Sequence, residues 1–517
     1  MTRTLSPRDL RAAWAANREI ALIDLRPEGP YADGHPLFAL SVPVSELEVT
    51  LPRLVPRLST PVVVYDAGEG YAAAALPRLA ALGYTDVAVL DGGLAGYAAE
   101  GEIYIDVNVP SKAFGELVES IRHTPSLPAA EVKRLLDSED DLVVLDARRY
   151  EEFSTMSIPR GQSVPGGELV YRIAEIAPSP ETLVIVNCAG RTRSIIGTQS
   201  LINAGIPNRV VALRNGTIGW TLAGLSVETA ARARGADPSE DARARARQRA
   251  HDWTAHVGVP VIDAATLTDW AAEGDRTLYL LDVRTPAEHA LSHPPGFVSA
   301  PGGQLVQATD EWLGTRGARV VLYDDDGTRA RMAASWLVQM GWDAAVIDDP
   351  RGFVPPAPAP GWAPEVDTVP HAPEGATIAD LARHAEHARG HVPGAHWVSG
   401  PDLARDLAAL PGEGPIVLTS PDGRVAAANL VQARGATPRP VHVLAGGTAG
   451  WHGPLETGSR AVSVPNDAYK RPYEGTDNAA EKMQAYIDWE LGLVAQLAND
   501  GVSRFRVIRA APQASDG

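Results

Sequence analysis

Cys188 is the only cysteine in the chain, and two arginines, Arg191 and Arg193, follow it closely. The apolar run 183–186 before it predicts a buried strand, and apolar residues at helical spacing from Ile195 onward predict a helix. Cys188 is therefore expected on a strand-to-helix turn, where the first backbone N–H groups of the helix carry partial positive charge. We expect these groups and the two arginines to stabilise the thiolate over the thiol. This arrangement is typical of a reactive nucleophile rather than of a small buried apolar side chain.

The stretch 188–194, CAGRTRS, resembles the active-site loop of the rhodanese sulfurtransferases. In that family C-x-x-x-x-R curls into a cradle of backbone N–H groups around a persulfide, and Cys188 and Arg193 have this spacing. The match to the form C-x-x-G-x-R-S is approximate, because glycine stands third and arginine fourth. Related phosphatases use a loop one residue longer, and the position that would carry their arginine is Ser194. This loop length disfavours a phosphatase or an arsenate-reducing enzyme.

The resemblance implies a sulfurtransferase that works in two steps. Cys188 would take a sulfane sulfur from a small anionic donor such as thiosulfate and pass it to an external thiol or cyanide, with ping-pong kinetics. Arg191 is expected to attract the donor, and Arg193 to pair with a carboxylate that fixes the turn. Asp146 and Arg148 match the D-x-R element of the family and are expected to order the neighbouring loop. The persulfide would be held by the N–H groups of Ala189, Gly190, Arg191, Thr192, Arg193 and Ser194. No cofactor and no metal are expected.

Three other stretches repeat the cysteine loop without a cysteine, each between an apolar run and a helical pattern. They begin at Asp66, Asp324 and Ser420. In the first three copies an aspartate that ends a short apolar run lies 42 residues before the loop: Asp24, Asp146 and Asp282. The fourth copy lacks a clear version of this run and keeps RGHVPGAHWV, which resembles an element of rhodanese-like domains. The sequence therefore contains four versions of one unit, of which the three without a thiol are expected to be inactive.

Short apolar strands alternate with amphipathic helices in each copy, which predicts an α/β fold with a small parallel sheet covered by helices on both faces. The resemblance implies this architecture in four tandem rhodanese-like domains. The expected domains are 1–105, 124–228 (catalytic), 258–354 and 373–455. They are joined by a connection at 106–124, a helical linker at 229–257 and a Pro-rich spacer at 355–364, and followed by a helical tail at 456–517.

A helix is predicted within the tail because apolar residues recur there at helical intervals. They are Met483, Tyr486, Ile487, Leu491, Val494 and Leu497. We expect this helix to dock on the body of the protein in preference to a partner subunit. Each domain also contains a glycine turn that ends in an aromatic residue, which indicates backbone geometry and packing rather than a phosphate loop.

The composition limits the class of protein. The 517 residues are enough for three or four domains, and the net charge of −18 argues against general nucleic-acid binding. No apolar run is long enough for a membrane span, and the first residues do not resemble a secretory signal, so a cytoplasmic location is expected. An acidic body around a basic loop would favour a small anionic substrate. A homo-oligomer stays open.

A second interpretation belongs to a different class. Cys188 could become persulfidated or oxidised without turnover, and the chain would then act as a sensor or a protein-interaction scaffold. This protein would show a modified cysteine but no catalysis. Since the chain has no second cysteine, any acceptor of the sulfur must come from outside it in either case.

Overall fold

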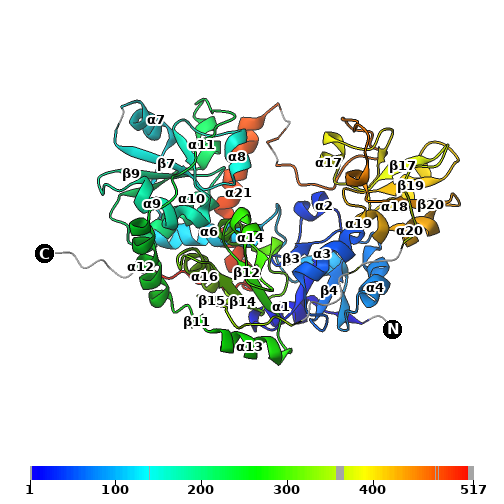
Figure 1. The fold of residues 1–517 in the computed structure, drawn as a ribbon, viewed down its shortest axis with the longest axis horizontal. Helices are drawn as coiled ribbons and strands as arrows, with labels where there is room; N and C mark the ends of the chain where they lie inside the picture. The colour runs from blue at the N-terminus through cyan, green and yellow to red at the C-terminus, as the bar shows by residue number, and fades with distance from the viewer. Residues whose placement is uncertain are drawn as a thin grey trace. The chain divides into compact units, whose positions relative to one another are not determined.

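The computed structural model describes residues 3–138, 140–356, 362, 366–471, 473–474 and 477–509. The chain divides into two compact lobes (Figure 1). The first lobe contains residues 1–13, 19–107 and 358–471, and the second contains residues 14–18, 108–357 and 472–517. The first and fourth domains therefore lie in one lobe, and the second and third in the other. Among the described residues, no helix combines the length and the apolar character needed to cross a membrane.

Each domain is built on a five-stranded parallel sheet, and the strand order is the same in all four. The second domain has the order β6-β10-β9-β7-β8. Its strands are β6 (Ser126–Leu127), β7 (Leu142–Asp146), β8 (Gly161–Ser163), β9 (Leu183–Asn187) and β10 (Val210–Leu213). The predicted α/β class in four tandem copies is confirmed.

The other three sheets have equivalent strands. The first contains β1 (Thr4–Leu5), β2 (Ala21–Asp24), β3 (Ala39–Ser41), β4 (Val62–Tyr65) and β5 (Val87–Leu90). The third contains β11 (Val261–Ile262), β12 (Leu278–Asp282), β13 (Val298–Ser299), β14 (Arg319–Tyr323) and β15 (Asp343–Ile347). The fourth contains β16 (Thr368–Val369), β17 (Thr377–Asp380), β18 (His396–Trp397), β19 (Ile416–Thr419) and β20 (Val441–Leu444).

Helices surround the sheets of the first lobe. They are α1 (Pro7–Ala15), α2 (Glu28–Asp33), α3 (Leu47–Leu54), α4 (Tyr71–Ala81), α5 (Gly93–Ala98), α17 (His384–Arg389), α18 (Leu403–Ala409), α19 (Arg424–Ala428) and α20 (Leu430–Ala436). The central strands β4 and β19 are buried along their whole length, as expected for strands covered on both faces.

The helices of the second lobe include those that position the cysteine loop. The lobe contains α6 (Val109–Arg122), α7 (Ala129–Asp137), α8 (Tyr150–Thr155), α9 (Leu169–Ile176), α10 (Thr192–Asn203), α11 (Gly216–Leu222), α12 (Glu240–Val257), α13 (Ala264–Glu273), α14 (Pro286–Leu291), α15 (Gly302–Gln307), α16 (Arg329–Gln339) and α21 (Ala479–Asp500). One hydrophobic core continues through its two domains, with members such as Leu145, Val186, Leu322 and Trp336. The two sheets therefore share a single buried interior.

The fourth domain contains the strand that its sequence did not reveal. β17 occupies the place in its sheet that β7 has in the second domain, and it ends in Asp380. Asp380 lies 40 residues before Ser420 rather than 42, and the arginine of the D-x-R element is absent. The strand of which the sequence shows no clear copy is therefore present, and a two-residue deletion and the loss of the arginine hid the repeat.

The predicted linker and tail helices are both present, with different limits. α12 begins at Glu240, so the first part of the expected helical linker 229–257 is not helical. The side chain of Ser239 accepts a hydrogen bond from the N–H of Ala242, which sets the start of the helix. In the tail, Leu491 is 52% exposed although it was expected in the apolar stripe, and the neighbouring Glu490 is buried instead. Most of the Pro-rich spacer 355–364 lies outside the described residues.

Candidate active site

Cys188 lies directly after β9 and before α10, at the carboxyl end of a central strand. Its side chain is buried, with 1% of the residue exposed. The Sγ atom lies 3.4 Å from Ser194 Oγ, and this hydroxyl donates to the carbonyl of Arg191 at 2.8 Å. The predicted strand-to-helix turn is confirmed, and the loop closes on the sulfur through Ser194.

The acidity of the thiol differs from the expectation. Burial raises the pKa of Cys188 above its ordinary value. The charge of Arg193, the contact with the Ser194 side chain and the hydrogen bond from the Ser194 backbone N–H oppose this effect without overcoming it. The prediction that the loop makes the free thiol more acidic is therefore wrong, because it did not include the cost of burying an anion.

Arg193 is fixed by a carboxylate, as expected. Its Nη1 donates to the two carboxylate oxygens of Glu152, at 3.0 and 2.8 Å. Glu152 belongs to the short helix α8 and was not identified from the sequence. The repeat carried a signal for it, because Glu288 stands at the same distance after Asp282 as Glu152 does after Asp146, and Glu288 pairs with Arg329 of the third domain.

Replacing Glu152 by Gln is expected to destabilise the protein in a pH-dependent way. Burial alone would raise the pKa of Glu152, but Arg193 and Arg149 lower it from 4.5 to about 2. The stabilisation is therefore complete above pH 4.5 and disappears as the pH falls towards 2. The variant should lose about 2 kcal/mol of unfolding free energy at pH 7 and much less at pH 3. Urea unfolding followed by circular dichroism measures both values. The exposed Glu151→Gln is the control, and an equal loss at both pH values would contradict the assignment.

Arg191 is held by α6 and by the loop after β10. It forms a bidentate ion pair with Glu116, at 2.7 and 2.8 Å, and its Nη1 donates to Asn215 Oδ1 at 3.0 Å. Glu116 is buried, so the charge of the arginine is matched at close range. The expectation that Arg191 attracts an anionic donor stays a prediction, but its guanidinium is already engaged.

Asp146 and Arg148 form the pair that the D-x-R element implied. Arg148 donates to both carboxylate oxygens of Asp146, at 2.8 and 2.7 Å, and to the carbonyl of Met156 at 2.6 Å. Asn187, the residue before the cysteine, donates to Asp146 at 2.9 Å. These bonds connect the segment after β7 to the end of β9, and so support the start of the cysteine loop.

The amino-terminal end of α11 holds the loop from the other side. The backbone N–H and the hydroxyl of Thr217 donate to the carbonyl of Cys188 at 2.8 and 3.0 Å. Gly216 has a φ of +55°, and a Cβ on it would lie 2.4 Å from the carbonyl oxygen of Cys188. The glycine turn therefore has the packing role expected for it, because only glycine permits this approach.

Gly216→Ala is expected to cost about 2 kcal/mol or more of stability, since it adds a steric clash to a left-handed backbone conformation. The displaced loop should also transfer sulfur more slowly. Gly224→Ala is the matched control, because Gly224 has a φ of +72° and a Cβ added to it would meet nothing within 4 Å. Thermal melting and turnover of both variants test this prediction. Equal losses of stability and turnover in the two variants would show that glycine is needed at position 216 for its backbone conformation alone, and not for its contact with the cysteine loop.

All four loops close on the side chain of their first residue in the same way. In each domain the backbone N–H six positions later donates to that side chain. The pairs are Ala72 to Asp66 at 2.8 Å, Ser194 to Cys188, Ala330 to Asp324 at 2.9 Å and Ala426 to Ser420 at 3.2 Å. In the first and third domains the enclosed group is a carboxylate. The shared loop thus directs a backbone N–H at the enclosed side chain, and in the second domain that side chain carries sulfur.

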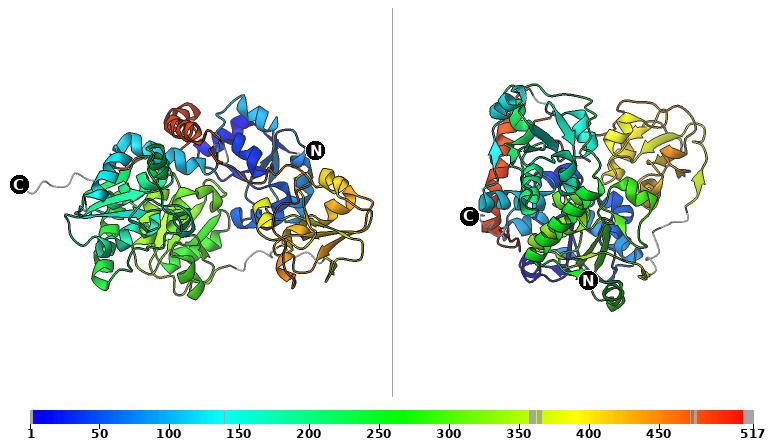
Figure 2. Two further views of the ribbon diagram at one scale, coloured as in Figure 1. Left: turned by 90° about the horizontal axis from the view of Figure 1, so that it is seen from above. Right: turned by 60° about the vertical axis from the view of Figure 1, so that its left-hand side comes forward.

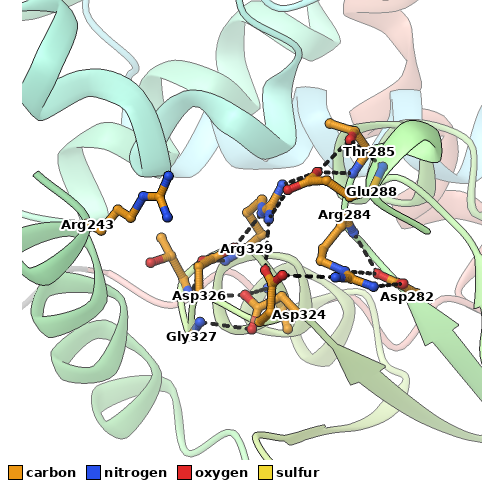
Figure 3. A network of polar contacts seen from close by, with 12 residues as sticks. Arg243, Asp282, Arg284, Thr285, Glu288, Asp324, Asp326, Gly327 and Arg329 are labelled. Atoms are coloured by element: carbon orange, nitrogen blue, oxygen red, sulfur yellow. Dashed lines mark hydrogen bonds and ion pairs between the residues drawn. The ribbon is translucent and has the colours of Figure 1, made fainter. Parts of the chain in front are cut away.

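In the third domain, a buried carboxylate and a network of ion pairs stand where the second domain has its thiol (Figure 3). Asp324 accepts hydrogen bonds from the N–H groups of Gly327 and Thr328, at 2.9 and 3.0 Å. Burial and the adjacent Asp326 raise its pKa to about 7. Arg329 occupies the position of Arg193 and pairs with Glu288, Asp325, Asp326 and, from the second domain, Glu168. Arg329 therefore forms part of the contact between the second and third domains.

A family model described as the rhodanese-like domain matches residues 6–100, 128–223, 263–349 and 367–454. The chain belongs to the rhodanese family. Within this family it is similar to a solved thiosulfate sulfurtransferase from Pseudomonas aeruginosa, with 51% sequence identity and a TM-score of 0.93. The match covers 98% of this chain and 100% of that one. A curated thiosulfate sulfurtransferase from Azotobacter vinelandii is 26% identical over 211 residues, which is 37% of this chain and 77% of the relative.

Proposed function

We propose that the protein is a sulfurtransferase in which Cys188 carries a sulfane sulfur as a persulfide. The observation that carries this proposal is the comparison of the four loops. They share one closing hydrogen bond, and Cys188 alone places a thiol at that point. Both relatives are named thiosulfate sulfurtransferases, which supports thiosulfate as a donor.

The reaction needs two displacements at sulfur. The Cys188 thiolate attacks the outer sulfur of thiosulfate, a new S–S bond forms as the S–S bond of thiosulfate breaks, and sulfite leaves with the bonding electrons. A thiolate or cyanide from solution then attacks the outer sulfur of the persulfide, and Cys188 leaves as a thiolate. The N–H groups of residues 189–194, with Ser194 already bonded to Sγ, would stabilise the anionic persulfide.

The other three domains are proposed to be inactive, with Asp66, Asp324 and Ser420 in place of the nucleophile. In the second lobe the third domain shares its core with the catalytic one, which supports a structural role for it. Domain boundaries, a cytoplasmic location and the oligomeric state stay predictions.

Initial-rate kinetics with thiosulfate and cyanide varied together test the proposal. A persulfide mechanism gives parallel double-reciprocal lines and releases one equivalent of sulfite before any cyanide is added. Intersecting lines, with sulfite released after cyanide addition alone, would instead require both substrates to bind together and would refute the covalent mechanism.

A sensor without turnover is the second candidate, and the burial of Cys188 favours it, because a buried thiol with a raised pKa reacts slowly. In that case sulfite would be released once, and cyanide would produce no further turnover.

A further inference from the structure

The tail helix α21 lies against the cysteine loop. It packs along α6 and α11, the two helices that supply Glu116 and Thr217 to the loop, and Figures 1 and 2 show it beside α6. A Cβ on Gly190 would lie 3.3 Å from Glu490 Oε2 and 3.8 Å from Tyr486 Cε1. A segment some 300 residues away in the sequence therefore forms part of the surroundings of the loop.

The position of this helix is fixed by contacts on both sides of Glu490. The ammonium group of Lys112 on α6 lies 5.5 Å from the ring centre of Tyr486 and 5.6 Å from that of Trp489, which are cation–π distances. Ile487 and Leu493 are buried. Glu490 itself is 2% exposed, so its carboxylate is held at the loop and is weakly screened by solvent.

The charges around the loop do not add up to a basic site. Arg193 is paired with Glu152, and Arg191 with Glu116. Glu490 adds a third carboxylate beside two guanidinium groups. Burial lowers the pKa of Arg191, but Glu116 and then Glu490 raise it by a larger amount, which places the negative charge of Glu490 within reach of this arginine.

The equivalent place in the third domain has charges of both signs, because Asp326 stands at the loop position of Gly190. Gly327 stands at the loop position of Arg191, and a Cβ on it would lie 3.3 Å from Arg247 Cγ of α12. α12 packs on α16 as α6 packs on α10. In the domain with the thiol, glycine stands at the loop position of Asp326, and the nearby carboxylate comes from Glu490 of the tail helix.

We propose that Glu490 determines donor specificity by charge. Its carboxylate disfavours donors that bring two negative charges to the loop, as thiosulfate does, and favours a sulfane sulfur carried by an organic persulfide with a single charge. The inference rests on the proposed function, since it concerns the substrate of the same site. It makes thiosulfate a usable donor but a poor one.

Alkylation of Cys188 tests the charge effect without any turnover. Iodoacetate and iodoacetamide differ in charge and little in size, and a single cysteine makes the intact mass an unambiguous readout. Glu490→Gln should raise the rate ratio of iodoacetate to iodoacetamide about tenfold. Glu490→Asp keeps the charge and should leave the ratio near that of the native protein. Asp488→Asn, on the exposed side of the same helix, is the matched control and should not change it.

The ratio of the two alkylation rates also distinguishes a change of charge near Cys188 from easier access of any reagent to Cys188. If Glu490→Gln merely loosens α21, both reagents will react faster by the same factor, and this result would overturn the proposal. In parallel, kcat/KM for thiosulfate should rise about tenfold in Glu490→Gln, and kcat/KM for cysteine persulfide, whose net charge is −1, should rise less. Equal changes for both donors would also overturn it. If the native protein takes sulfur from neither donor while the alkylation ratio shifts, the proposed function fails and the charge effect of Glu490 stands.

Discussion

Cys188→Ser is expected to lower thiocyanate formation from thiosulfate and cyanide by about ten thousandfold or more, to the level of the uncatalysed reaction. A serine hydroxyl is a poor nucleophile towards sulfur and cannot carry the transferred atom as a persulfide. The other three loops offer two carboxylates and a hydroxyl at the same position, so they cannot replace it.

The serine variant should fold normally. Cys188 accepts a hydrogen bond from the Ser194 N–H and lies near its hydroxyl, and serine fits both contacts. Its melting temperature should therefore be close to that of the native protein, so the loss is chemical. Substantial turnover in this variant would mean that another residue carries the sulfur.

Arg329→Met is expected to produce the largest loss of stability in the second lobe, about 3–5 kcal/mol. Arg329 is 1% exposed and is the shared partner of Glu168, Glu288, Asp325 and Asp326. Figure 3 shows its guanidinium between Glu288 and Asp326. Methionine fills similar space but leaves Glu168 and Asp326 buried without this partner. Thermal and urea unfolding of the full chain measure the loss.

Arg351→Met is the matched control, because the Arg351 side chain is 90% exposed and pairs with Asp349 at the surface. Such a solvent-exposed pair contributes little to stability. The account of the domain contact would be contradicted if the two variants were equally stable.

The fold could be predicted because the sequence pattern of one domain recurs four times along the chain. The loop residues Asp66, Cys188, Asp324 and Ser420 follow short apolar runs, and three of them lie at a constant distance from an aspartate. Periodicity of this kind depends on contacts that are local in the sequence. The fourth copy shows the limit of this approach, because a two-residue deletion before Ser420 and the loss of the arginine after Asp380 together hid β17.

The electrostatics of the site could not be predicted in the same way. Glu116, Glu152 and Glu490 reach the loop from three helices at different places in the chain, and tertiary packing alone brings them to Arg191, Arg193 and Gly190. The sequence showed the two arginines of the loop but not their partners. It therefore indicated a basic loop and an acidic thiol, whereas the structure has matched charges and a thiol whose pKa is raised by burial.

The most direct test of the central claim is the intact mass of the protein after incubation with thiosulfate, measured before and after the addition of cyanide. The account predicts a gain of one sulfur atom that is absent in Cys188→Ser and that is lost, with release of thiocyanate, when cyanide is added. No gain in mass from thiosulfate or from glutathione persulfide, or the same gain in Cys188→Ser, would contradict sulfur transfer through Cys188.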